Sequence, residues 1–111
     1  MTFFNFPRDS INWIGDRSSL EKTYYSAAAE RAHCRKCGTP IYMRYYKESD
    51  RIGIAAGSIT ENTMKDALPK PDHHIFVAEK ASWFDLPEDG LPRHDYHTDS
   101  FQEGLDAFKK A

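Results

Sequence analysis

Two cysteines, Cys34 and Cys37, are separated by two residues and followed by Gly38. A Cys-x-x-Cys-Gly sequence projects two thiolates from one tight turn, and glycine permits the positive φ that such a turn requires. This is the form of a zinc knuckle. Structural zinc takes four ligands, however, and the sequence has no second cysteine pair. The spacing therefore predicts half of a zinc site.

Two other interpretations of this pair stay open. A redox dithiol needs its first cysteine at the N-terminus of a helix, where the helix dipole lowers the pKa, and Pro40 prevents a helix from starting at the cysteines. The pair could also remain as two thiols without metal. The nearby cations Arg31, Arg35 and Lys36 favour thiolates, which helps metal binding as much as redox chemistry.

Histidine nitrogens are further candidate ligands, at His33, His73, His74, His94 and His97. The pair His94-x-x-His97 has the better spacing, but histidines in a polar loop before a helix are more often solvated, and neither lies in a standard Cys/His spacing. His73 and His74 stand at the head of an expected strand, so alternation sends one ring to each face. We expect a satisfied structural histidine there rather than a ligand.

Composition limits the function classes. A chain of 111 residues allows one domain, and its net charge of −2 supplies no basic surface for nucleic acid. No apolar run approaches the eighteen or so residues of a membrane span, and the N-terminus lacks the features of a signal peptide. We expect a cytoplasmic protein with reduced cysteines, binding neither nucleic acid nor membrane.

Aromatic residues are frequent, and they could line a cleft for a small polar ligand. Large aromatics at strand positions more often supply the buried area of a small β-domain. We therefore expect a core role for this set, which comprises Trp13, Tyr24, Tyr25, Tyr42, Tyr45, Tyr46 and Trp83.

The elements that position these residues are mostly strands. Bulky residues flank a turn within residues 4–13, and β-favouring segments follow at residues 20–25, at the hairpin arms 40–46 and 52–59, and at residues 74–77. Only the C-terminus is helical in pattern: Ser100 can cap a helix with Glu103 three residues later, and Phe101, Leu105 and Phe108 share a face. The fold is predicted to be mainly antiparallel β with a short C-terminal helix.

Taken in order, several motifs resemble the glutathione-dependent formaldehyde-activating enzyme family, which includes centromere protein V. The series comprises Glu30-Arg31-x-x-Cys34-x-x-Cys37-Gly38-Thr39-Pro40-Ile41, Ala56-Gly57-Ser58-Ile59, His74-Ile75-Phe76-Val77-x-x-Lys80-x-x-Trp83 and Asp89-Gly90-Leu91-Pro92. The resemblance implies twisted antiparallel sheets of a zinc-stapled β-tent type. It also implies carbon–sulfur lyase activity, in which glutathione and formaldehyde combine into S-hydroxymethylglutathione.

The family typically begins with a Cys-x-Cys pair and a Cys-x-Cys-x-x-Cys cluster, before the segment equivalent to Phe4. The early pair joins the residues matching Cys34 and Cys37 around a structural zinc, and the cluster holds the catalytic zinc. Residues 1–97 are thus expected to be a family domain lacking its cysteine-rich N-terminal part, followed by a helix at residues 98–111. Only the structural metal role, at Cys34 and Cys37, carries over.

These implications set the functional expectations. Catalysis by this chain alone is not expected, because the ligands of the catalytic zinc are missing and no catalytic residue can be assigned. A glutathione-type thiol adduct is the expected partner. A homodimer through an exposed N-terminal sheet edge, near Phe3, Phe4 and Phe6, is a further expectation. The alternative function is a non-catalytic, zinc-ribbon-like protein-binding module that uses its aromatic surface.

Overall fold

The structure of the protein is a computed structural model that describes residues 1–110, apart from the side chains of Tyr25 and Lys110. The chain forms two compact units, which divide between Pro69 and Lys70. Each unit is described by itself below. This division into compact units does not test the predicted family domain over residues 1–97, which stays a prediction.

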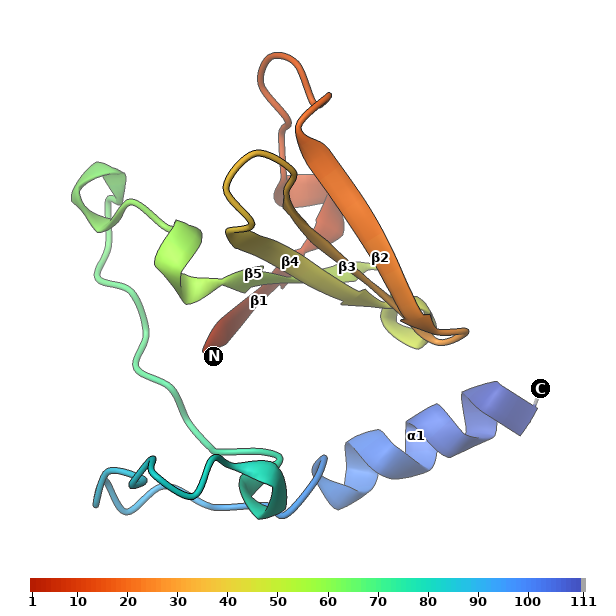
Figure 1. Cartoon of the computed structure of the whole chain (residues 1–111), viewed down its shortest axis with the longest axis vertical. Coiled ribbons are helices and arrows are strands. Elements are labelled where there is room, and N and C mark those ends of the chain that lie inside the picture. Colours follow the sequence, from red (N-terminus) through yellow and green to blue (C-terminus); the bar gives the residue numbers. More distant parts are fainter. Residues whose placement is uncertain (111) are drawn as a thin grey trace. The chain divides into compact units, whose positions relative to one another are not determined.

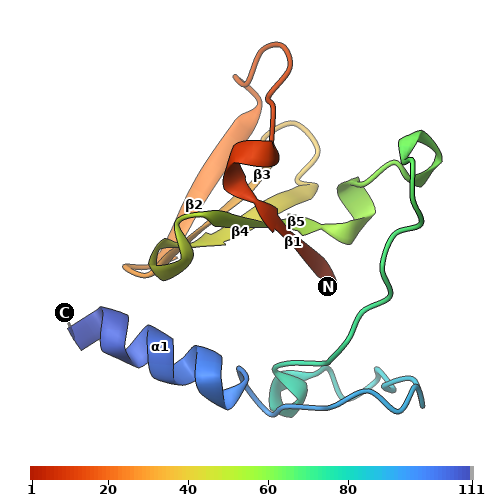
Figure 2. The ribbon, with the colours of Figure 1, turned by 180° about the vertical axis from the view of Figure 1, so that it is seen from behind.

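The first unit is built on a five-stranded antiparallel sheet with the strand order β1-β5-β4-β3-β2. The strands are β1 (Phe3–Pro7), β2 (Leu20–Ser26), β3 (Ala29–Cys34), β4 (Pro40–Tyr45) and β5 (Arg51–Ala55). Strands β2 to β5 follow one another as a meander, and the N-terminal strand β1 adds to β5 at the far edge (Figures 1 and 2). The mainly antiparallel β fold predicted from the sequence is confirmed.

One face of the sheet carries the core. Residues that pair directly across antiparallel strands share a face, and the pairs Phe6–Ile52, Tyr42–Ile54 and Ala32–Tyr42 connect that face from β1 to β3. Ala32, Tyr42 and Ile52 are its buried centre, and the partly buried residues that pack on them are Phe6, Ile11, Leu20, Ile41 and Ile54. Cys34 lies on the same face, because it pairs with Leu20 on β2.

Strand β3 was not predicted. Its sequence, Ala-Glu-Arg-Ala-His-Cys, lacks the branched and aromatic side chains that favour strands. It is a strand because β2 and β4 pair with it on both sides. The predicted strand at residues 52–59 is shorter, since a 3₁₀ turn follows β5 at Ala56–Ser58, and β1 likewise ends in a 3₁₀ turn at Arg8–Ser10.

The strand predicted at residues 74–77 is wrong. His74 makes only an isolated bridge to Arg93, and Phe76 has a left-handed φ of 54°. The backbone hydrogen bonds of this segment go to the loop that follows it in sequence: His74 N–H donates to the Pro92 carbonyl, and Val77 N–H donates to the His94 carbonyl. These bonds satisfy the backbone without a regular ladder.

The predicted C-terminal helix is confirmed as α1 (Asp99–Lys110). It begins at Asp99, so Ser100 lies within its first turn rather than at the cap. Leu105 is 5% exposed and Phe101 is half-buried, whereas Phe108 remains exposed. Within residues 1–110, no helix has the length and apolar character needed to cross a membrane.

Candidate metal centre and its supporting network

The Cys34–Cys37 knuckle is the turn between β3 and β4. Cys34 is the last residue of β3, and Cys37 is exposed in the turn. The backbone closes the turn twice, because Gly38 N–H donates to the Cys34 carbonyl at 2.7 Å and Cys34 N–H donates to the Thr39 carbonyl at 2.9 Å. Gly38 has a φ of 77°, as the sequence predicted. Both cysteines therefore lie on one tight turn that is closed by backbone hydrogen bonds.

Both cysteines are free thiols, and the turn favours the thiolate form of Cys37. The Thr39 hydroxyl, with Oγ1 3.0 Å from Cys37 Sγ, is the main cause of a lowered Cys37 pKa; the Thr39 backbone and the Cys34 side chain add to the effect. A thiolate is the form that binds metal or attacks a disulfide. The turn is thus suited to either chemistry.

The donor set fits half of a tetrahedral zinc site. Two thiolates on one turn are the usual contribution of a zinc knuckle, and full coordination needs two further ligands. Across residues 1–110, no three histidine, cysteine, aspartate or glutamate side chains gather closely enough to hold a metal ion. Zinc held by this chain would therefore need donors from elsewhere, and no donor set for a catalytic zinc lies in the described part.

Most of the candidate histidines have other contacts. His33 lies 3.5 Å from the Glu21 carboxylate, which also lies 3.8 Å from Arg35. In the second unit, His73 pairs with Asp72 and meets the His94 ring edge-on at 5.8 Å between ring centres. His97 meets the Phe76 ring edge-on and the Phe101 ring at a tilt, with 4.7 Å between ring centres in both contacts.

His74 is the satisfied histidine that the sequence predicted. Its Nε2 lies 2.8 Å from Asp89 Oδ2, while Asp89 Oδ1 accepts the Leu91 N–H at 3.0 Å. The Leu91 bond, followed by that of His74, lowers the pKa of Asp89. His74 and Asp89 are fifteen residues apart in sequence, and their contact joins the two motifs that contain them.

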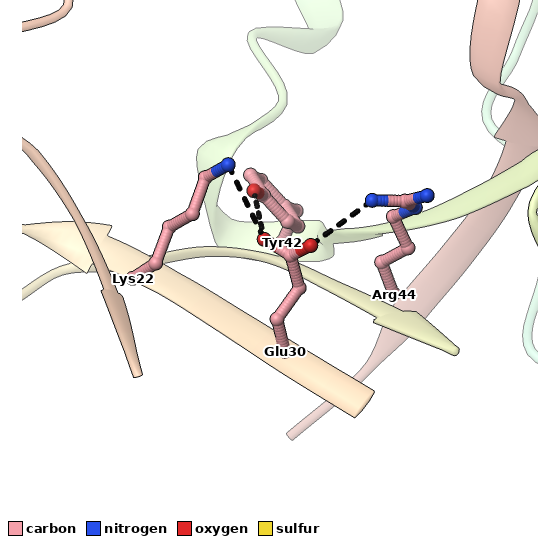
Figure 3. A network of polar contacts seen from close by, with 4 residues as sticks. All are labelled: Lys22, Glu30, Tyr42 and Arg44. Carbon is pink, nitrogen blue, oxygen red and sulfur yellow. Dashed lines mark hydrogen bonds and ion pairs between the residues drawn. The ribbon is translucent and has the colours of Figure 1, made fainter. Parts of the chain in front are cut away.

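A polar network on β3 was missed by sequence reasoning. Glu30 is 4% exposed, and its carboxylate accepts hydrogen bonds from the Tyr42 hydroxyl at 2.9 Å and from Arg44 Nη1 at 3.0 Å. Lys22 Nζ lies 3.5 Å from the same carboxylate (Figure 3). The donors come from β2 and β4, on either side of β3, so one buried carboxylate ties three strands together.

The electrostatics of this network favour an ionised Glu30. Burial by itself would raise the pKa of Glu30, but the Tyr42 hydrogen bond and the charges of Lys22 and Arg44 outweigh it and lower the pKa. Burial and the Glu30 carboxylate raise the pKa of Tyr42, which keeps its hydroxyl proton. Arg44 also stacks on Tyr46, with Cζ 5.4 Å from the ring centre.

One face of β3 carries Glu30, Ala32 and Cys34, because side chains two residues apart on a strand point to the same side of the sheet. The four-residue interval from Glu30 to Cys34 therefore places the buried carboxylate and the first knuckle cysteine on the same side of the sheet. The network fixes β3 between its neighbours, and the knuckle begins where β3 ends. The only sequence signal for this support was the Glu30-Arg31-x-x-Cys34 spacing itself.

The aromatic set divides between core and surface. Tyr42 is buried at 6% exposure, as predicted, and its ring lies 6.1 Å from that of Trp13. The core expectation is wrong for Tyr24 and Trp83, which are 63% and 82% exposed, and Trp13 is also an exposed residue. Tyr45 and Tyr46 are half-buried, and the side chain of Tyr25 lies outside the described residues.

A family model described as glutathione-dependent formaldehyde-activating enzyme matches residues 1–79. The match covers well over half of the chain. The chain belongs to this family. No curated protein and no solved structure matches it. The matched segment of this formaldehyde-activating family member contains the knuckle, the Glu30 network and His74, whereas Trp83 and Asp89 lie beyond it.

Proposed function

We propose that this chain is a carbon–sulfur lyase family protein that binds glutathione or its hydroxymethyl adduct, with Cys34 and Cys37 as half of a structural zinc site. The observation that carries the proposal is the family match over residues 1–79. The shape of the knuckle supports the zinc role, because two thiols stand on one glycine-closed turn. When bound, zinc would cross-link the turn and staple the sheet into the β-tent form.

The proposed ligand is anionic, and the knuckle offers local positive charge. Arg35 and Lys36 lie between the two cysteines and are exposed. Cationic side chains at a surface raise the local concentration of anions such as glutathione. The proposal is limited to binding, because the described residues hold no donor set from which a catalytic zinc could act. The two free thiols support placing the protein in a reducing compartment, the cytoplasm.

Glutathione binding without turnover is the expected behaviour of the 111-residue chain. Titrating glutathione, with and without formaldehyde, into isotope-labelled, zinc-loaded protein should shift backbone amide resonances of the knuckle. Lys36→Glu should weaken binding about fivefold, since reversing an exposed charge beside an anion changes the free energy by about 1 kcal/mol. Lys65→Glu, the same change at another exposed lysine, is the matched control and should leave binding unchanged.

The rate of formaldehyde consumption tests whether this chain catalyses the reaction of formaldehyde with glutathione. With glutathione present, consumption should not exceed that of the uncatalysed mixture. Turnover that a chelator abolishes would contradict the non-catalytic reading. A titration that moves no resonances would instead exclude glutathione as the ligand.

A protein-binding module is the second candidate, and the exposure of Trp83 favours it. Trp83 is 82% exposed and meets Phe84 edge-on, with 6.2 Å between ring centres. Exposed tryptophans are frequent energetic centres of protein interfaces. On this hypothesis the aromatic pair, rather than the thiols, contacts a partner.

Trp83→Ala should weaken such a complex by about 2 kcal/mol, roughly thirtyfold in affinity. The measurement is quantitative recovery of the bound protein with the wild type and each variant. Cys34→Ser should retain the partner, and so should Ile14→Ala, which changes another exposed hydrophobic residue. If Cys34→Ser abolishes recovery and Trp83→Ala does not, the aromatic surface is not the interface.

A further inference from the structure

The knuckle presents an incomplete donor set at an accessible position. Cys37 is exposed and Cys34 is half-buried, and every residue from Arg35 to Pro40 is exposed. The turn lies at an end of the sheet, where β3 passes into β4 (Figure 1). Both thiols can therefore be approached from outside the chain by a metal ion and by a second set of ligands.

A second copy of this chain carries the matching set. Two thiolates from each of two copies make the four-sulfur tetrahedral arrangement that structural zinc prefers. A two-fold axis through the metal would relate the copies, so that the same surface meets itself, as in most protein dimers. One chain lacks two donors among its described residues, and the pair of chains lacks none.

The charges of the turn suit this arrangement only when metal is present. A zinc ion with four thiolates carries a net charge of −2, and Lys36 of each copy would flank it, whereas Arg35 already lies 3.8 Å from the Glu21 carboxylate. Without zinc, the Lys36 side chains of the two copies would be brought together with no anion between them. Like charges brought together at a surface oppose association, so the approach of two turns should depend on the metal.

We propose that one zinc ion joins two copies of this chain through Cys34 and Cys37 of both. The inference rests on the zinc role proposed above, and adds that the partner copy completes the site. It commits the homodimer to the knuckle rather than to the free edge of β1.

The test uses the reduced 111-residue chain, first stripped of metal and then titrated with zinc. Native mass spectrometry and sedimentation should show a monomer without zinc and a dimer holding one zinc ion, which saturates at half a zinc per chain. A chelator should return the monomer. Cobalt(II) in place of zinc should give the intense thiolate-to-metal absorption of a four-sulfur site at the same stoichiometry.

Cys37→Ser should lose the zinc-dependent dimer, and Ser49→Ala should keep it. Ser49 is an exposed residue of the turn between β4 and β5, so it controls for changing a small polar side chain in a turn. Circular dichroism against the metal-free wild type separates loss of the site from loss of the fold. The cobalt spectrum of the wild type tests the donor set without any variant.

Three results would overturn the proposal. A monomer with one zinc ion would keep the metal at the knuckle but remove the partner. A dimer that survives the chelator would place the contact elsewhere, with the β1 edge as the first region to examine. A chain that binds no zinc would remove the metal role itself, while the glutathione titration would still stand as a separate test of the ligand.

Discussion

Glu30→Gln is expected to lower the free energy of unfolding by about 2 kcal/mol, or about 10 °C in Tm for a domain of this size. The amide keeps the volume of the side chain but loses its charge. Arg44 and Lys22 would then face a neutral group in place of the carboxylate, which they now approach at 3.0 and 3.5 Å. A buried group that loses its charged partner is left with the cost of its desolvation.

Urea denaturation at pH 7 measures this loss, and Glu61→Gln is the matched control. Glu61 is exposed, so the same substitution there should change the free energy of unfolding by less than about 0.5 kcal/mol. Tyr42→Phe removes the hydroxyl that donates to Glu30, and a double-mutant cycle between positions 30 and 42 should give a coupling energy of about 1 kcal/mol. Equal stability of Glu30→Gln and wild type would show that the network contributes nothing net.

The pH dependence of the free energy of unfolding is an independent test of the contribution of Glu30. Because the pKa of Glu30 is lowered in the folded protein, its contribution is fully present above the unfolded value of about 4.3. It is lost as the pH falls from there through the lower folded pKa. The stability difference between wild type and Glu30→Gln should shrink over that acid range. The lowered pKa values of Asp16 and Asp89 belong to both proteins, so their effects cancel in the difference.

The cysteine knuckle and the family could be predicted from the local sequence, but the Glu30 network could not. Cys-x-x-Cys-Gly is a contiguous signal, and its turn forms as the residue types require. Glu30, Lys22 and Arg44 lie on three strands, and only the cross-strand register brings them together. The register of a strand depends on its pairing with segments that are distant in sequence, so it cannot be predicted from a short stretch of residues.

The same physics accounts for the missed and the wrongly predicted strands. β3 has weak strand formers and is held by its two neighbours, so tertiary pairing overrides its propensity. Residues 74–77 have strong strand formers, but they face a loop rather than a strand, and Phe76 adopts a left-handed conformation. In both segments the available partner decided the backbone structure, whereas β4 was predicted correctly because its composition and its partners agree.

Gly53→Val is expected to destabilise the first unit by about 3 kcal/mol, through overpacking between strands. Gly53 is buried on β5, where it pairs with Asn5 of β1 on one side and with Met43 of β4 on the other. A Cβ atom at this position would lie 3.2 Å from Asn5 Oδ1 and 3.3 Å from the Met43 carbonyl oxygen. The Asn5 side chain can move aside, but a backbone carbonyl in a ladder cannot do so cheaply.

Gly57→Val provides the comparison, because a Cβ at Gly57 would meet nothing within 4 Å, and Gly57 likewise has no positive φ. Its cost should stay below about 1 kcal/mol. Hydrogen exchange should locate the damage at Gly53, with the amides of β1 losing protection before those of β3, since β1 is an edge strand that pairs with β5. Equal costs at the two glycines would mean that β1 does not need the close approach that Gly53 permits. A larger cost at Gly53 with early exchange in β1 would show that the absence of a side chain there is what allows the N-terminal strand to complete the sheet.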